Sequence, residues 1–105
     1  MFDTALSSRI YTIVSSIPKR HVLSYGDVAR LSGICGPRQV GRILHYNPDN
    51  STVPCHRVVH EDGRLAPAFA FGGEDAQKKK LEHEGVVFRG ACVDMQTSRW
   101  KTSFS

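Results

Sequence analysis

The sequence predicts a mainly α-helical domain with one small β-hairpin, and three observations point to this fold class. Apolar residues recur at helical spacing near the N-terminus, two short helical segments follow with a glycine-containing turn between them, and a charged helical segment precedes a hairpin pattern. A chain of 105 residues has room for one modest core. We therefore expect a single domain over residues 1–105.

Residues 4–17 are expected to form an amphipathic helix. Asp3 or Thr4 is a suitable N-cap, and Pro18 closes the segment because proline cannot continue a helix. The apolar residues that share one face are Leu6, Ile10, Ile13, Val14 and Ile17. This face is expected to form the floor of the core.

Two further short helices form a helix-turn-helix candidate. The first should span about residues 25–32, after Ser24 and Asp27, whose spacing resembles a capping box. Glycine and proline in residues 33–37 mark the turn, and the second helix should run to about residue 46. The side chains that it turns away from the core are Arg38, Gln39, Arg42 and His45. A basic face of this kind suits DNA, but an ordinary solvated helix face has the same composition.

The C-terminal half predicts an ordered loop, a helix and the hairpin. Residues 61–73 are rich in turn formers and contain two phenylalanines. Residues 74–84 are charged and predict a helix that ends at Gly85, a favourable residue just beyond a helix. Residues 86–88 and 92–95 have the apolar composition of two short strands around a tight turn.

Composition limits the classes of protein. The formal charge of +4 suits a polyanionic partner without requiring one. Three widely spaced cysteines form neither a disulfide framework nor a zinc motif, so we expect no metal and a reducing compartment, the cytoplasm or a eukaryotic nucleus. No apolar run approaches the roughly 18 residues of a membrane span, so no membrane association is expected.

The most informative stretch is Pro54-Cys55-His56-Arg57-Val58, inside an otherwise apolar segment. A thiol becomes a good nucleophile only when its thiolate is stabilised, and an imidazole with nearby cations does this. The stretch therefore suggests thiol chemistry at Cys55. The alternative is that Cys55 is a small core residue, because free cysteines are among the most buried residues.

On these residues the chain resembles a known family, the O6-alkylguanine-DNA alkyltransferases and the related alkyltransferase-like proteins, from about Leu6 to Trp100. The most specific match is Asn47-Pro48 followed by residues 53–59, which resemble the family's active-site segment. The segments that also match are Ser24-Tyr25-Gly26-Asp27-Val28-Ala29, Arg38-Gln39-Val40-Gly41 and Leu81-Glu82-His83-Glu84-Gly85. The resemblance thus covers nearly the whole chain.

The resemblance implies a winged-helix-like domain that enters the minor groove of double-stranded DNA and rotates an O6-alkylguanine out of the base stack. By the match, Arg38 fills the vacated space and Tyr25 helps to rotate the nucleotide, while Ser24, Gln39 and Arg42 belong to the DNA-binding face. Extrusion costs a few kcal/mol, and least for a damaged base. A monomer without a cofactor is expected.

The resemblance also implies a reaction in which a cysteine takes the alkyl group permanently. Cys55 would be the acceptor, His56 would take its proton through a water, and Glu84 would hold the other imidazole nitrogen. Asn47 would fix the turn that aims the thiol, and Tyr25 would donate a proton to the leaving guanine. The residues expected to line the lesion pocket are Val53, Pro54, Cys55, Arg57, Ala68 and Phe69.

Two functions follow, because the body of the chain resembles the alkyltransferase-like branch. Gln39 follows the arginine, the turn before it is one residue short, and Ala68 and Phe69 replace a polar lid. That branch binds alkylated bases without repair and hands them to nucleotide excision repair. We favour stoichiometric transfer because the four active-site residues Asn47, Cys55, His56 and Glu84 occur together; the alternative is a lesion sensor. An ordinary winged-helix regulator would have no use for a Cys-His pair.

Overall fold

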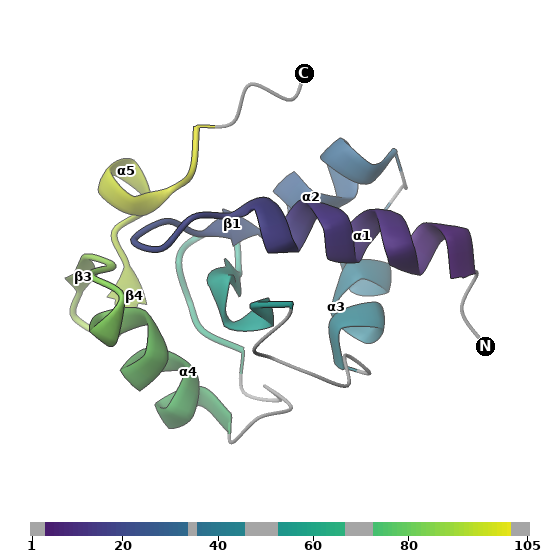
Figure 1. Cartoon of the computed structure of the whole chain (residues 1–105). Helices are drawn as coiled ribbons and strands as arrows, with labels where there is room; N and C mark the ends of the chain where they lie inside the picture. The colour runs from purple at the N-terminus through teal and green to yellow at the C-terminus, as the bar shows by residue number, and fades with distance from the viewer. Residues whose placement is uncertain (1–3, 34–35, 46–52, 67–72, 102–105) are drawn as a thin grey trace.

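The computed structural model describes residues 4–33, 36–45, 53–66 and 73–101. In chain order the elements are α1 (Thr4–Ser16), β1 (Leu23–Ser24), α2 (Tyr25–Ser32), α3 (Pro37–His45), the 3-10 helix η1 (Cys55–Arg57), β2 (Val58–Val59), α4 (Gly73–His83), β3 (Phe88–Arg89), β4 (Cys92–Val93) and α5 (Met95–Ser98). Helices predominate in the described part of the chain, which confirms the predicted fold class (Figure 1).

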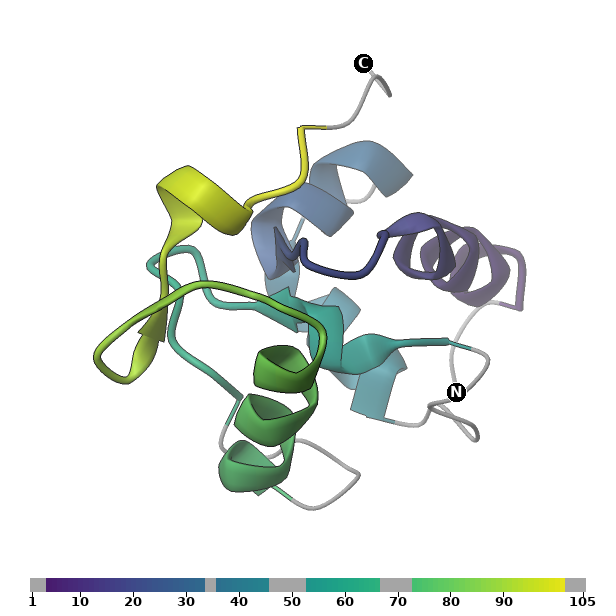
Figure 2. The same ribbon diagram turned by 60° about the vertical axis from the view of Figure 1, so that its left-hand side comes forward.

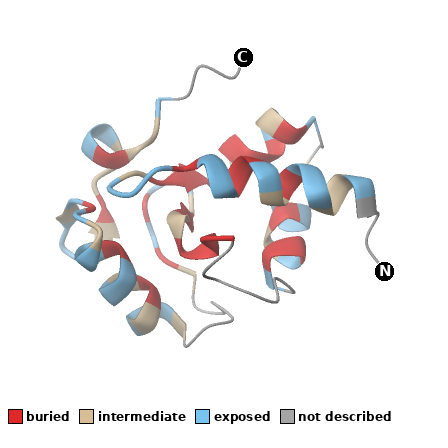
Figure 3. Cartoon of the chain, in the orientation of Figure 1, coloured by how far each residue is buried: buried red, intermediate tan, exposed pale blue. Residues whose placement is uncertain are grey.

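Helices α1, α2 and α3 surround the main core. The apolar face predicted for the first helix is buried at Ile10, Ile13 and Val14, and Ile17 just beyond its end is buried as well. The buried residues from the other two helices are Val28, Ala29, Val40, Ile43 and Leu44. Figure 3 shows this buried side of each helix turned toward the centre of the molecule. Helix α1 starts at Thr4, and the alternative cap Asp3 lies outside the described residues.

The predicted helix-turn-helix is confirmed in α2 and α3. Ser24 accepts a hydrogen bond from the Asp27 amide, and Asp27 accepts one from the Ser24 amide, so the capping box is complete. Gly33 ends α2 with φ of 80°, a left-handed conformation that favours glycine. Pro37 is the first residue of α3, where a missing N–H costs nothing.

A parallel pair of two-residue strands, β1 and β2, crosses the middle of the molecule. Leu23 pairs with Val58 and Ser24 pairs with Val59. The sequence did not predict this pair, because two residues are too few to show a period of two. The pair ties the start of the helix-turn-helix to the end of η1.

The C-terminal elements pack on a second cluster of buried residues, which is Val22, Val59, Leu65, Leu81, Val86 and Val93. Helix α4 begins and ends one residue before the predicted bounds, and Gly85 beyond it has φ of 87°. The predicted hairpin forms between β3 and β4, with Phe88 paired to Val93. The short helix α5 was not predicted; Asp94 caps it by accepting from the amides of Gln96 and Thr97.

The two clusters meet at the β1–β2 segment, where Leu23 and Val58 belong to the main core and the adjacent Val22 and Val59 belong to the second cluster. The turned view shows α4 and the β3–β4 hairpin on the side of this segment away from α1 (Figure 2). Over the described residues, no helix has the length and the apolar character needed to cross a bilayer.

Candidate active site and nucleic-acid interface

Cys55 is the first residue of η1, and η1 leads directly into β2. The turn is held by hydrogen bonds from the Cys55 amide to the Val53 carbonyl, at 2.8 Å, and from the Arg57 amide to the Pro54 carbonyl, at 3.0 Å. Cys55 is only 6% exposed and belongs to the main core cluster. The thiol is therefore buried, as a core cysteine would be, within a turn whose backbone hydrogen bonds fix its position.

Glu84 connects the two residues that follow the thiol. Its Oε1 lies 3.0 Å from Nε2 of His56. Arg57 donates to both carboxylate oxygens, from Nε to Oε1 at 2.9 Å and from Nη2 to Oε2 at 2.7 Å. A third Arg57 nitrogen, Nη1, donates to the Ile17 carbonyl at 2.7 Å. These contacts fix the His56 ring between η1 and the residue that follows α4.

Burial and this hydrogen bonding determine the charge of the cluster. Burial lowers the pKa of His56 and outweighs the opposing effect of Glu84, so the imidazole is neutral near pH 7. Burial is the largest single effect on Glu84 and disfavours its carboxylate, but the hydrogen bonds and charges of Arg57 and His56 together outweigh it and hold the pKa of Glu84 below the usual range. The arrangement places a neutral base next to the thiol in the chain and orients it with a carboxylate.

The parallel strand register places Tyr25 beside His60, and Tyr25 packs against the core cluster that contains Cys55. Since Ser24 pairs with Val59, the next residues, Tyr25 and His60, are neighbours, and their ring centroids are 5.3 Å apart. Burial, and secondly the negative charge of a Cys55 thiolate, raise the pKa of Tyr25 to about 12. Tyr25 therefore keeps its proton at neutral pH and can donate a hydrogen bond.

Gln77 is a site residue that the sequence patterns did not single out. It is fully buried on α4 and donates from Nε2 to the carbonyls of His56 and Val58, at 3.0 and 3.1 Å, and accepts from the Ala66 amide at 2.8 Å. A signal was present, because Gln77, Leu81 and Glu84 are spaced by four and three residues and so share one helix face. That face of α4 holds the backbone and side chains of η1.

The structure separates the predicted DNA-binding residues into two groups. Arg38, Gln39 and Arg42 are exposed on α3, whereas Ser24 is fully buried, and its hydroxyl donates to Glu61 at 2.8 Å. Ser24 is thus placed as the cap of α2 and not on the exposed face. Arg57, expected to line the lesion pocket, donates to Glu84 and to the carbonyl of Ile17, just beyond the end of α1.

Three predicted site residues, Asn47, Ala68 and Phe69, lie outside the described residues. Val53 and Pro54 are buried next to Cys55 in the chain. Within the described ranges, no group of three His, Cys, Asp or Glu side chains is placed to hold a metal ion.

These features define a helix-turn-helix domain that contains a buried Cys-His-Glu cluster and, on α3, an exposed basic face. The chain matches the family model described as 6-O-methylguanine DNA methyltransferase, DNA binding domain, over residues 5–86. It belongs to this family.

Individual relatives carry different names. The chain is 38% identical over 102 residues to a DNA base-flipping protein of Escherichia coli strain K12, and the match covers 93% of this chain and 76% of that protein. It is 39% identical over 87 residues to a methylated-DNA–protein-cysteine methyltransferase of Methanothermobacter thermautotrophicus, and this match covers 83% of the chain and 48% of the enzyme. This chain thus spans about half the length of that enzyme.

A solved structure extends the similarity to nearly the whole fold. The crystal structure of Schizosaccharomyces pombe Atl1 in complex with damaged DNA containing O6-carboxymethylguanine superposes with a TM-score of 0.82 at 30% identity. The match covers 97% of this chain and 100% of that one.

Proposed function

We propose that this protein binds O6-alkylguanine in double-stranded DNA, turns the base out of the helix, and transfers its alkyl group irreversibly to Cys55. The observation that carries the proposal is the cluster at η1, where Cys55 adjoins a buried neutral His56 whose Nε2 is 3.0 Å from Glu84. A binding function alone has no need of an imidazole oriented in this way. Asn47 completes the set of active-site residues by its match to the family segment.

The DNA step is assigned to α3 and the start of α2. The exposed Arg38, Gln39 and Arg42 would contact DNA, with Arg38 entering the base stack and the neighbouring side chains holding phosphates. Tyr25, next to α3 at Gly41, would help to rotate the target nucleotide. The DNA bound to S. pombe Atl1 contains O6-carboxymethylguanine, which supports an O6-alkylguanine as the ligand of this chain.

The transfer step is a single displacement. The Cys55 sulfur attacks the alkyl carbon, a carbon–sulfur bond forms, and the bond between that carbon and guanine O6 breaks with its electrons going to guanine. His56 takes the thiol proton, and Tyr25 supplies hydrogen bonding or a proton to the departing base. The products are unmodified guanine and an S-alkylated Cys55, so each molecule acts once.

A second function is a sensor that binds the lesion and leaves the alkyl group in place. The relative named DNA base-flipping protein and another named alkyltransferase-like protein 1 favour it. In this case Cys55 would serve as a small side chain of the pocket, and the bound lesion would be passed to nucleotide excision repair.

The DNA product distinguishes the two functions. The protein is incubated with an excess of duplex that carries one O6-methylguanine, and the nucleosides released by digestion are quantified. Transfer predicts restored guanine up to one equivalent of protein and no further. Restoration beyond one equivalent contradicts a stoichiometric reaction, and selective lesion binding without restored guanine supports the sensor.

A further inference from the structure

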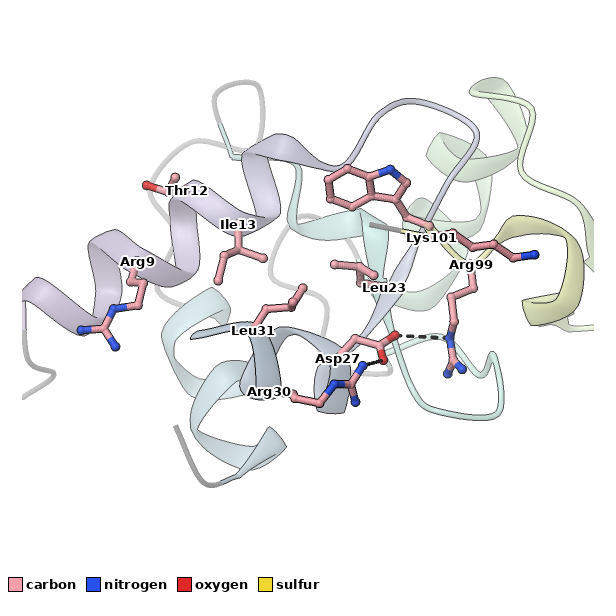
Figure 4. A pocket seen from close by; sticks show the side chains of 10 residues that line it. Arg9, Thr12, Ile13, Leu23, Asp27, Arg30, Leu31, Arg99 and Lys101 are labelled. Carbon is pink, nitrogen blue, oxygen red and sulfur yellow. Dashed lines mark hydrogen bonds and ion pairs between the residues drawn. The ribbon is translucent and has the colours of Figure 1, made fainter. Parts of the chain in front are cut away.

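A groove of about 1000 Å³ lies between α1, α2 and the segment that follows α5 (Figure 4). Its described lining shares no residue with the Cys-His-Glu cluster or with the exposed face of α3. The groove is therefore a separate feature, and the function proposed above makes no use of it.

The wall of the groove is cationic, and three of its arginine side chains make hydrogen bonds or ion pairs within the protein. Four cationic side chains and one carboxylate line it, which are Arg9, Arg30, Arg99, Lys101 and Asp27. Asp27 pairs with Arg30 at 2.9 Å and with Arg99 at 3.3 Å, as Figure 4 shows. Arg9 donates to the Ser32 carbonyl at 2.7 Å. Because these contacts already restrict the arginines, binding an anion there would lose little side-chain entropy.

The floor of the groove is apolar. Ile13 and Leu23 are buried at its base, and Leu31 and Trp100 are half-buried in its lining. A surface that combines an apolar floor with cationic walls suits a ligand that has both apolar and acidic groups. Neither group alone would use the whole groove.

We propose that this groove docks an acidic segment of a second protein, one whose carboxylates alternate with leucine or phenylalanine side chains. The carboxylates would pair with the exposed Arg30 and Lys101, and an apolar side chain would pack on Leu31 and Trp100. Charge complementarity favours an acidic partner, because the four cations of the lining still outnumber Asp27 and Glu61, which pairs with Arg99 from outside the lining.

A nucleic-acid strand is the competing occupant, since it is also anionic. The observations favour the peptide for two reasons. The floor is mainly aliphatic, whereas single strands are bound by stacking on aromatic rings. The ionised Asp27 is already paired with Arg30 and Arg99, which lowers the positive charge left for a continuous phosphate backbone, while a peptide can place an amide or an apolar side chain beside it.

Trp100 provides the readout, because it is the single tryptophan of the chain. The probe is a short synthetic peptide of Asp and Glu interspersed with Leu and Phe, titrated into the full chain while Trp100 emission is recorded. The test variant is the double change Arg30→Glu with Lys101→Glu. The matched control is Lys19→Glu with Lys79→Glu, which alters the net charge equally at exposed positions outside the groove.

We expect a saturable change in Trp100 emission, weakened at least about tenfold by the groove double variant and little by the control. The same peptide with Asn and Gln in place of its acids should not bind. Unchanged emission, or equal weakening in both variants, would overturn the proposal. Tighter binding of a short oligothymidylate with the same variant dependence would also overturn it and assign the groove to nucleic acid. Lesion binding is assigned to α3, which lies outside the groove. The groove double variant should therefore still bind the damaged duplex, so failure of the peptide test can be told apart from failure of the proposed function.

Discussion

At the scale of single residues, the Glu84 carboxylate pairs with the side chains of two consecutive residues, His56 and Arg57. Both the arginine and the glutamate are close to 90% buried, with side-chain exposures of 12% and 11%. A buried carboxylate is tolerated only when it is paired and hydrogen-bonded. Arg57 is therefore a positioning residue for His56, because it keeps Glu84 ionised and in place.

Replacing Arg57 with Ala should lower the free energy of unfolding by about 3 kcal/mol, since it leaves a buried charge without its bidentate partner. The matched control is Arg64→Ala, which breaks an exposed ion pair with Asp62 and should leave the free energy of unfolding almost unchanged. Urea unfolding of both variants measures the difference. Equal, small effects would mean that the buried pair contributes little to the fold.

At the scale of elements, α4 acts on the site through one face. Gln77 forms hydrogen bonds with three backbone groups, one each in η1, β2 and the following loop. Gln77→Ala would therefore leave these donors and acceptors unsatisfied. We expect a loss of about 2 kcal/mol in unfolding free energy. Gln96→Ala, at an exposed position of α5, is the control and should change stability by less than about 0.5 kcal/mol. A loss as small in Gln77→Ala would contradict the anchoring role.

Helix α3 carries the prediction for DNA. Arg38→Ala should weaken binding to duplex with O6-methylguanine much more than Arg42→Ala does, because Arg38 is proposed to fill the space left by the extruded base. Loss of a phosphate contact at Arg42 should mainly reduce the salt dependence of binding: the slope of log affinity against log salt concentration should become less steep by about 1. Titrations over a range of salt concentrations measure both effects. Equal losses in the two variants would remove Arg38 from its proposed role.

The elements also show what the sequence can predict. Helices α1 to α4 are predictable because their periods, the capping box at Ser24 and the glycines after α2 and α4 are local signals. The parallel β1–β2 pair and the contacts of Gln77 are not, since they join residues far apart in sequence. The hydrogen bonds of Arg57 to Glu84 and to the Ile17 carbonyl also join distant residues, and no local signal predicts them. The approach of Glu84 to His56 was expected only from the resemblance.

At the scale of the whole molecule, acid stability follows from three groups. His56, Glu84 and Asp27 all have pKa values lowered by folding. Each binds its proton more readily in the unfolded chain, so each contributes stability that is present above its unfolded pKa and lost as pH falls through its folded pKa. The free energy of unfolding should be greatest between about pH 6.5, the ordinary value for histidine, and pH 10.0, the ordinary value for the tyrosines whose pKa folding raises, and should decline on acidification. Glu84→Gln should flatten the part of that decline below about pH 4.5, the ordinary value for glutamate, and a protein that gained stability in acid would contradict these assignments.

Transfer to Cys55 is tested most simply by the mass of the intact protein after incubation with a duplex that carries one O6-methylguanine. We expect a gain of one methylene in mass, which is absent with undamaged duplex and absent in Cys55→Ser. The Cys55→Ser variant should still bind the damaged duplex selectively. An unchanged mass, together with selective lesion binding by the unaltered protein, would rule out transfer to Cys55 and leave a lesion sensor.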